Sequence, residues 1–181
     1  MTREEGLAAI RERVGNRNLI KHMLATEAVM RGLASRFGED EDAWGLAGLV
    51  HDIDFEETAE DPERHGLVSA EILRGMGVAD DVIHAVKAHG DQVACETLMD
   101  RAIVAADPVT GLVVAAALMH PSKKLVEVDV PFIMRRFGEK RFAAGADRDR
   151  IRTCEGIGLP LEEFLGIALA SMQGISGDLG L

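Results

Sequence analysis

The segment Gly48–Asp54 reads GLVHDID, in which an apolar stretch ends in an adjacent histidine and aspartate, His51 and Asp52. The residues leading into it, 44–50, are mostly apolar, as in a helix that packs into a core. A buried carboxylate is costly unless it is paired or bound to a metal. The segment therefore predicts a helix whose apolar face fixes the position of an imidazole and a carboxylate at its end.

Helical periodicity extends over most of the 181 residues, and no alternating pattern persists long enough to build a sheet. The length suits one domain with a substantial core, so we expect a single all-α domain over residues 1–181. Glycine, asparagine and proline stops predict the helix ends, and Pro108 is expected to kink its helix. The predicted helices cover about residues 3–14, 17–37, from the acidic run 39–42 to 52, 61–74, 80–89, 96–119, 129–137, 147–154 and 161–172.

The formal net charge of −11 argues against binding of a nucleic-acid polymer, because most of the surface would repel a phosphate backbone. Cys95 and Cys154 show no C-x-x-C pairing, which suits reduced thiols. The first residues lack a signal-peptide core, and the apolar stretch 102–119 is interrupted by polar and helix-breaking residues at 107–111. We therefore expect a cytoplasmic protein without a membrane contact.

Histidine and aspartate residues fall at informative places on successive predicted helices. His22 lies mid-helix, His65 follows the Asp61-Pro62 helix start, His89 precedes a glycine, and Asp107 interrupts an apolar stretch. A divalent cation needs ligands that converge from separate rigid elements, because one helix offers only two on a face. Together with the His51-Asp52 pair, these scattered residues predict a metal site inside a helical bundle.

In order and approximate spacing, the set resembles the HD-domain superfamily of metal-dependent phosphohydrolases, in particular small bacterial proteins of the HDIG type. The resemblance covers about residues 16–112 and implies a bundle of about five core helices, with additional C-terminal helices over about 113–181. The stretches SKKL (122–125) and KRFAAG (140–145) are similar to the tail of an uncharacterised bacterial branch. The chain departs from the HDIG pattern in one respect: Ile53 is followed by Asp54 instead of glycine.

The resemblance implies that His22, His51, Asp52 and Asp107 bind one metal ion. His65 and His89 match the positions that hold a second ion in some members, with Asp52 bridging the two ions. It also implies catalytic roles for Asp52, His65 and His89. Imidazole and carboxylate donors suit Mn, Fe, Co, Ni or Zn, and the resemblance favours Fe or Mn, with one or two ions.

The implied activity is hydrolysis of a phosphomonoester or phosphodiester by metal-activated hydroxide, on a small phosphorylated substrate that could be a nucleotide. Two alternatives stay open. Some family members with a di-iron centre are oxygenases, and others could bind a nucleotide or metal as non-catalytic sensors.

Substrate contacts are less well defined by the sequence, as is the oligomeric state. The stretch Ser122–Arg152 holds nine Lys and Arg against five Asp and Glu, and could form a phosphate site or simply a solvated face. Phe55 is the best-placed aromatic residue for stacking on a base. Asp54, Glu56 and Glu57 are candidate proton donors or supports for the ligands, although surface solvation also explains them. The candidate phosphate contacts are Lys123, Lys124, Arg135, Arg136, Lys140 and Arg141.

Overall fold

The computed structural model describes residues 1–139 and 141–181, which form α-helices and two 3-10 turns, with no strand among them. The predicted all-α fold is confirmed. The α-helices are α1 (Arg3–Arg13), α2 (Arg17–Phe37), α3 (Glu41–Val50), α4 (Phe55–Thr58), α5 (Leu67–Gly75), α6 (Asp80–His89), α7 (Leu98–Met119), α8 (Val130–Phe137), α9 (Arg148–Arg152), α10 (Leu161–Gly174) and α11 (Ser176–Leu179), and the 3-10 turns are Leu125–Glu127 and Thr153–Ile157.

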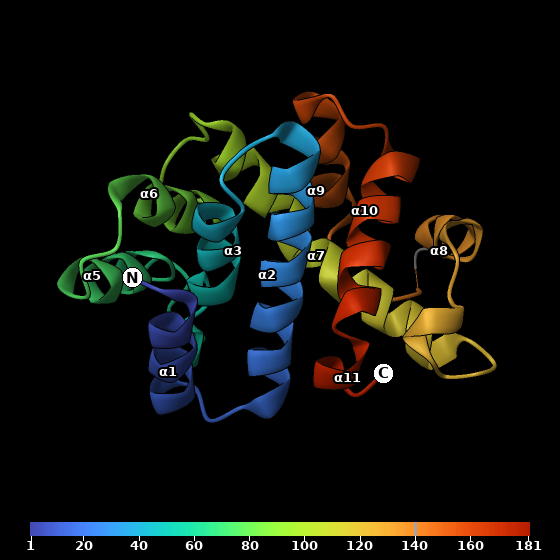
Figure 1. Cartoon of the computed structure of the whole chain (residues 1–181), viewed down its shortest axis with the longest axis horizontal. Helices are drawn as coiled ribbons and strands as arrows, with labels where there is room; N and C mark the ends of the chain where they lie inside the picture. Colours follow the sequence, from blue (N-terminus) through green and yellow to red (C-terminus); the bar gives the residue numbers. More distant parts are fainter. Residues whose placement is uncertain (140) are drawn as a thin grey trace.

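Helix α2 is central to the bundle. It stands between α3 and α10, with α7 packed against it from behind in the view of Figure 1. Its core face carries Met23, Met30 and Leu33, which are fully buried. Asn16 caps its first turn, and Gly38, with φ +71°, ends it in the left-handed conformation that glycine adopts without strain.

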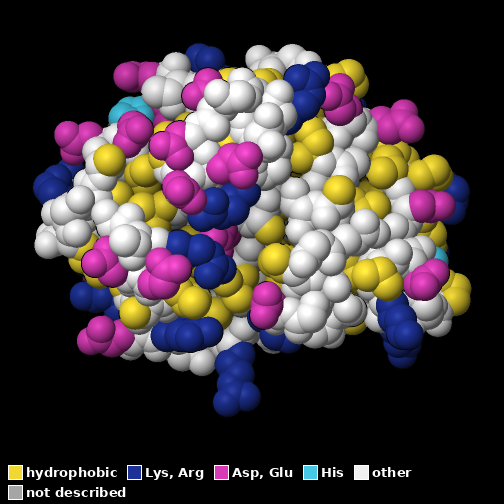
Figure 2. All heavy atoms as spheres, viewed as in Figure 1, with side chains coloured by type: hydrophobic (Ala, Val, Ile, Leu, Met, Phe, Trp, Pro, Cys, Tyr) yellow, Lys and Arg dark blue, Asp and Glu magenta, His cyan; other side chains and the backbone are white. Residues whose placement is uncertain are grey.

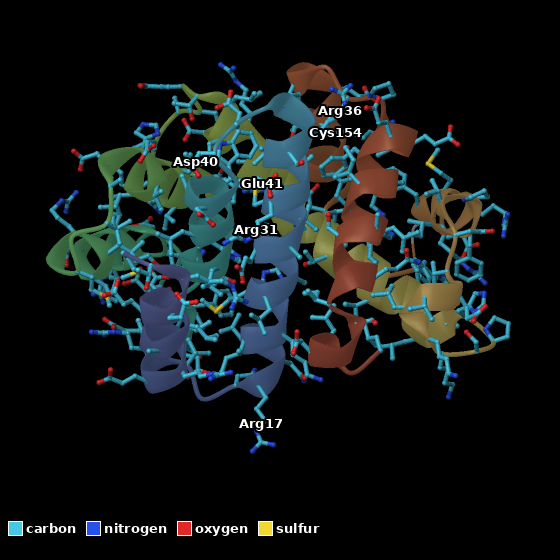
Figure 3. The ribbon with its side chains drawn as sticks, viewed as in Figure 1. Arg17, Arg31, Arg36, Asp40, Glu41 and Cys154 are labelled. Carbon is cyan, nitrogen blue, oxygen red and sulfur yellow. The ribbon has the colours of Figure 1, made fainter. Side chains whose placement is uncertain are left out.

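The close packing of α3 on α2 depends on glycine. A Cβ atom added to Gly48 would lie 2.7 Å from the backbone oxygen of Thr26 on α2, which is closer than real Cβ contacts allow. Beside this contact, Arg31 reaches from α2 to Asp42 of α3, near the capping residue Asp40 (Figure 3). The short distance between the two backbones brings the end of α3, with His51, against the face of α2.

Helices with clear end signals match their predicted ranges. Helices α2 and α6 have the predicted bounds, and α1 ends one residue early. Helix α7 begins at Leu98 after a capping box between Thr97 and Asp100, and it continues through Pro108. By length and composition, α7 is the one described helix that could cross a membrane, with a mean hydropathy of 2.0. Over half of that window, 56%, is buried inside the fold, and the core helix of a globular protein passes the same test.

The helix predicted for residues 61–74 is wrong at its start. Residues 61–66 form turns, and α5 begins only at Leu67, after Gly66 with φ +80°. The Asp61-Pro62 pair does not cap it. Instead, the carboxylate of Asp54, distant in sequence, accepts hydrogen bonds from the backbone N–H groups of Gly66 and Ser69. His65 therefore lies in the turn before α5 and not in a first helical turn.

The C-terminal helices pack onto the same core. Helix α10 contacts both α2 and α7, and α9 lies against α7 (Figure 1). The predicted helix 147–154 is α9 continued by the 3-10 turn Thr153–Ile157. The short helices α4 and α11 were not predicted. Because α7 carries Asp107, its contact with α9 places the C-terminal region beside the predicted metal site.

Candidate metal centre

The structure brings all six predicted metal ligands together at the centre of the bundle. They come from five parts of the fold: α2, the end of α3, the turn before α5, the end of α6 and the middle of α7. His51, Asp52 and His89 are buried, and the other three are partly buried. The six are His22, His51, Asp52, His65, His89 and Asp107.

Four of these residues form a first cluster. Nε2 of His22 lies 3.1 Å from Nε2 of His51 and 3.1 Å from Oδ1 of Asp107. Oδ2 of Asp52 lies 3.4 Å from Nε2 of His51 and 3.5 Å from Nε2 of His22. Two groups of three residues offer ligand atoms close enough together to hold a metal ion: His22, His51 and Asp107 in this cluster, and His51, Asp52 and His89, which extends beyond it.

The other two histidines form a second cluster around the other oxygen of Asp52. Nε2 of His65 and Nε2 of His89 are 3.0 Å apart. Oδ1 of Asp52 lies 3.4 Å from the first and 3.3 Å from the second. The two oxygens of Asp52 thus face different clusters, which is the arrangement of a carboxylate that bridges two ions.

Hydrogen bonds to the backbone fix the orientation of two of the imidazole rings. Nδ1 of His51 donates to the carbonyl oxygen of Gly48, 2.8 Å away, and Nδ1 of His89 donates to that of Val86. A carbonyl oxygen can only accept, so in a neutral ring the proton is on Nδ1 and the lone pair is on Nε2. Both rings therefore present to the centre a nitrogen whose lone pair could bind a metal ion.

Side chains, and not the backbone, orient the other two rings, again with Nε2 toward the centre. Nδ1 of His65 lies 2.9 Å from Oδ1 of Asp54, and Nδ1 of His22 lies 2.9 Å from the hydroxyl oxygen of Thr110. That hydroxyl donates to the carbonyl of Asp107, so it accepts from the ring. Metal-binding histidines commonly have such partners on the outer nitrogen.

The donor set fits a cation. With all four Nδ1 atoms donating, the lone pairs of His22 and His51 face each other at 3.1 Å and those of His65 and His89 at 3.0 Å. Facing lone pairs repel unless a cation or a proton lies between them. Each cluster is therefore arranged around a positive charge, either a proton on one of its rings or a bound cation.

The pKa shifts leave both carboxyl groups of the first cluster ionised and act in opposite directions on its two imidazoles. Burial lowers the pKa of His51 to about 4, which keeps its ring neutral. Burial alone would raise the pKa of both carboxyl groups, but neighbouring histidines outweigh it: the pKa of Asp52 falls well below its usual range and that of Asp107 falls to about 2. For His22, burial opposes the charged form, yet the hydrogen bond with Asp107 leaves the pKa raised. Two ionised carboxylates thus face the imidazoles.

Asp54, which replaces the HDIG glycine, is a buried support for the second cluster. One of its oxygens binds His65 and the other holds the start of α5, both described above. Burial opposes its ionisation, but the hydrogen bond with His65 and those from the backbone leave its pKa lowered. Glu56 instead accepts from the backbone before α2, and Glu57 is exposed and pairs with Arg64. Of the three candidate acidic residues, only Asp54 reaches the centre.

A cavity of about 380 Å³ opens onto the centre beside the second cluster. A second cavity of about 490 Å³ lies between α2, α7 and the C-terminal residues 179–181, and His22 is one of the residues that line it. Phe55 does not line the first cavity; it is 43% exposed, and its ring is perpendicular to that of His65, with the ring centroids 5.6 Å apart. The first cavity is lined by Pro62, His65, His89, Gly90, Asp91, Asp107, Pro108, Gly145, Asp147 and Arg150.

Five of the basic residues predicted to contact phosphate, Lys123, Lys124, Arg135, Arg136 and Arg141, line neither cavity. The sixth, Lys140, lies outside the described residues. Arg136, for example, pairs with Glu139 and packs on Phe132. Arg150, from the same basic stretch, lines the first cavity and was not predicted. Nothing in the local sequence distinguishes Arg150 from the arginines beside it, because its position depends on the packing of α9 against α7.

A family model described as HD domain matches residues 19–112, a range that contains all six residues of the centre. Similar curated proteins include ribonuclease Y of Nitratidesulfovibrio vulgaris, 31% identical over 96 residues, which are 53% of this chain and 18% of that protein. Ribonuclease Y of Opitutus terrae is 30% identical over 95 residues, with 52% and 18% covered, and that of Acidothermus cellulolyticus 31% over 94 residues, with 52% and 19% covered. The chain thus spans less than a fifth of the length of these relatives. No solved structure gave a significant match.

Proposed function

Because the chain belongs to the HD domain family, whose members are generally metal-dependent hydrolases, we propose that it hydrolyses a phosphate ester of a small, nucleotide-like substrate. The observation that carries the proposal is the position of Asp52, whose two carboxylate oxygens face two separate groups of imidazole nitrogens. A lone metal-binding histidine would be compatible with many functions. A carboxylate shared by two clusters supports a two-ion centre, and two-ion centres act on phosphate esters in phosphatases and nucleases.

We propose sites for two ions. His22, His51, Asp107 and one oxygen of Asp52 would hold the first. His65, His89 and the other oxygen of Asp52 would hold the second. We propose Fe or Mn, which nitrogen and oxygen donors accept. Bound there, such ions would lower the pKa of water to give a nucleophile at neutral pH and would neutralise the charge on phosphoryl oxygens.

The chain itself contributes orientation and access. The hydrogen bonds on Nδ1 hold all four rings with Nε2 toward the centre, so the site is organised before a substrate enters. The cavity of about 380 Å³ is near the lower end of the range for small-molecule sites and suits a mononucleotide-sized compound. Phe55, exposed beside His65, offers a ring on which a base could stack.

Charge supports a small substrate over a polymer. The net charge is −11, and on the face shown in Figure 2 the drawn Lys and Arg side chains are interspersed with Asp and Glu rather than gathered into one basic surface. A second candidate nevertheless has a specific observation in its favour, because the similar curated proteins are named ribonuclease Y. Cleavage of a phosphodiester bond in RNA is therefore the alternative that the experiment must include.

The test is a hydrolysis assay on the purified protein, combined with elemental analysis of its metal content. The substrates are p-nitrophenyl phosphate, bis(p-nitrophenyl) phosphate, linear and cyclic mononucleotides, and a labelled RNA oligonucleotide. We expect turnover of a small ester, and loss of both metal and turnover in Asp52→Ala with helicity retained by circular dichroism.

The matched control is Asp42→Ala, which removes a carboxylate that is 92% exposed and pairs with Arg31 far from the centre. This variant should keep its metal and its activity. Full metal occupancy in Asp52→Ala would contradict the site, and a higher kcat/KM on RNA than on every small ester would favour the ribonuclease alternative.

A further inference from the structure

We propose that Arg150, supplied by α9 outside the matched HD region, binds the phosphate group of the substrate beside the second cluster. This inference rests on the proposed function and adds a recognition residue to it. Arg150 lines the 380 Å³ cavity together with His65, His89 and Asp107. The inference thus gives a chemical role to α9, which lies outside the matched residues 19–112.

Contacts hold the guanidinium group at the end of α6. Nη2 of Arg150 donates to the backbone carbonyl of His89, the residue whose ring belongs to the second cluster. Nη1 donates to Oδ2 of Asp91 at 2.7 Å. The positive group is thus fixed against the backbone of a predicted metal ligand and still faces the cavity, with its side chain 26% exposed.

The remaining hydrogen-bonding capacity of Arg150 matches an anion. A guanidinium carries five N–H donors and stays charged at any ordinary pH. Two of these donors have the partners given above among the described residues, which leaves three N–H groups for a ligand. Arginine forms paired hydrogen bonds with phosphate oxygens, and these are among the stronger hydrogen bonds in proteins.

The cavity wall gives Arg150 a role that no neighbour shares. Of the described residues that line the cavity, it is the one Lys or Arg, while Asp91, Asp107 and Asp147 are acidic. A phosphate group approaching the centre would meet these carboxylates, and Arg150 is the side chain on the wall that offsets their charge. The metal ions alone would attract any anion, whereas a planar donor group at a fixed place favours a phosphate.

The ion pair between Arg150 and Asp91 is weak enough for a phosphate group to replace Asp91. The side chain of Asp91 is 78% exposed, and an ion pair this accessible to water contributes little to stability. Asp91 has φ +60° directly after the end of α6, where a residue in the left-handed conformation commonly ends a helix. A phosphate oxygen can therefore replace the Asp91 carboxylate on the guanidinium at small cost.

A purely structural role for Arg150, as a cap on the last carbonyl group of α6, predicts a different response. In that case Arg150→Met would lower stability and leave the affinity for phosphate unchanged. If Arg150 binds phosphate, its loss should weaken phosphate binding, and the loss of Asp91, which removes both a competing partner and a negative charge from the cavity wall, should tighten it.

The experiment measures inorganic phosphate binding to the metal-loaded protein by calorimetry, and KM and kcat on the best small ester. The variants are Arg150→Met, Arg150→Lys and Asp91→Asn. The control is Arg36→Met, which breaks an ion pair of the same length, 2.7 Å to Glu163, at the end of α2 (Figure 3). Metal content and thermal unfolding are recorded for each.

We expect Arg150→Met to weaken phosphate binding and raise KM by about tenfold or more, with a smaller change in kcat. Arg150→Lys should recover part of the affinity because the charge returns without the paired geometry. Asp91→Asn should tighten phosphate binding, and Arg36→Met should change neither constant.

Two outcomes overturn the inference: phosphate affinity and KM that are the same in Arg150→Met as in Arg36→Met, or a wild-type protein that binds no phosphate. The first of these with turnover intact leaves the proposed hydrolase standing. Phosphate binding that depends on Arg150 in a protein without hydrolytic turnover supports the inference while the proposed function fails.

Discussion

Replacement of Asp54 by asparagine tests how the second cluster is held. The carboxylate accepts from Nδ1 of His65 on one oxygen, and on the other from the backbone N–H groups of Gly66 and Ser69, each at 2.8 Å. Asparagine has nearly the same shape but offers one oxygen and one NH₂ group. It can therefore satisfy the backbone donors or the imidazole, but not both.

Each orientation of the amide has a measurable cost. If its oxygen faces the backbone, the NH₂ group faces Nδ1 of His65, the proton of the ring moves to Nε2, and that nitrogen no longer has a lone pair for a metal. Loss of such an outer partner typically lowers metal affinity by about 10- to 100-fold. If the amide is reversed, the NH₂ group opposes two buried backbone donors, which costs about 1–3 kcal/mol of stability at the start of α5.

Metal titration by calorimetry and urea unfolding of the metal-free protein distinguish the two orientations of the new amide in Asp54→Asn. In the first case one of two ions binds weakly and stability changes little; in the second the metal-free protein unfolds at lower urea. Glu57→Gln is the control, because it also removes one acidic group but from a side chain that is 57% exposed. A variant Asp54→Asn that binds two ions with wild-type affinity and keeps wild-type stability would refute the reasoning.

Three further predictions concern single contacts. Thr110→Val removes the hydroxyl that accepts from His22, so affinity for the first ion should fall about 10- to 100-fold in equilibrium dialysis, and unchanged affinity would count against the assigned tautomer. Gly48→Ala places a Cβ atom 2.7 Å from a backbone oxygen of α2 and should cost about 1–3 kcal/mol in urea unfolding, whereas Gly75→Ala, with nothing within 4 Å of the new atom, should not destabilise the protein. Burial raises the pKa of the Cys154 thiol to about 11, so iodoacetamide should fail to modify it in native protein at pH 8 and should succeed in urea, as mass spectrometry would show; rapid native modification would contradict its burial.

The sequence predicts helices well where the end signals are local. Asn16 and Gly38 bound α2, and Thr97 caps α7, each through atoms within a few residues of the helix end. The start of α5 was predicted at Asp61-Pro62 because that pair has the composition of a local cap. The observed cap comes from Asp54, thirteen positions before Leu67, and only the tertiary fold brings it there.

The same distinction separates the ligands from their supports. Histidine and aspartate at fixed places in an otherwise apolar pattern can be recognised without a structure, because burial of such groups needs a reason. Their outer partners are ordinary residues. Thr110 is one threonine in a helix, and Arg150 is one arginine among several in a basic stretch, so the sequence offers no signal that either reaches the centre.

The two clusters differ in how firmly the backbone holds their side chains. This difference makes the position of the second cluster more sensitive to Asp54 than the position of the first. His22 and Asp107 project from the interiors of the long helices α2 and α7, and His51 follows the close contact of α3 with α2. His65 lies in a turn, and Nδ1 of its ring is held by Asp54 at 2.9 Å, with the hydroxyl of Thr58 farther away at 3.4 Å. The second cluster also has three donor residues against four in the first. A change at Asp54 should therefore act on the second ion and leave the first in place.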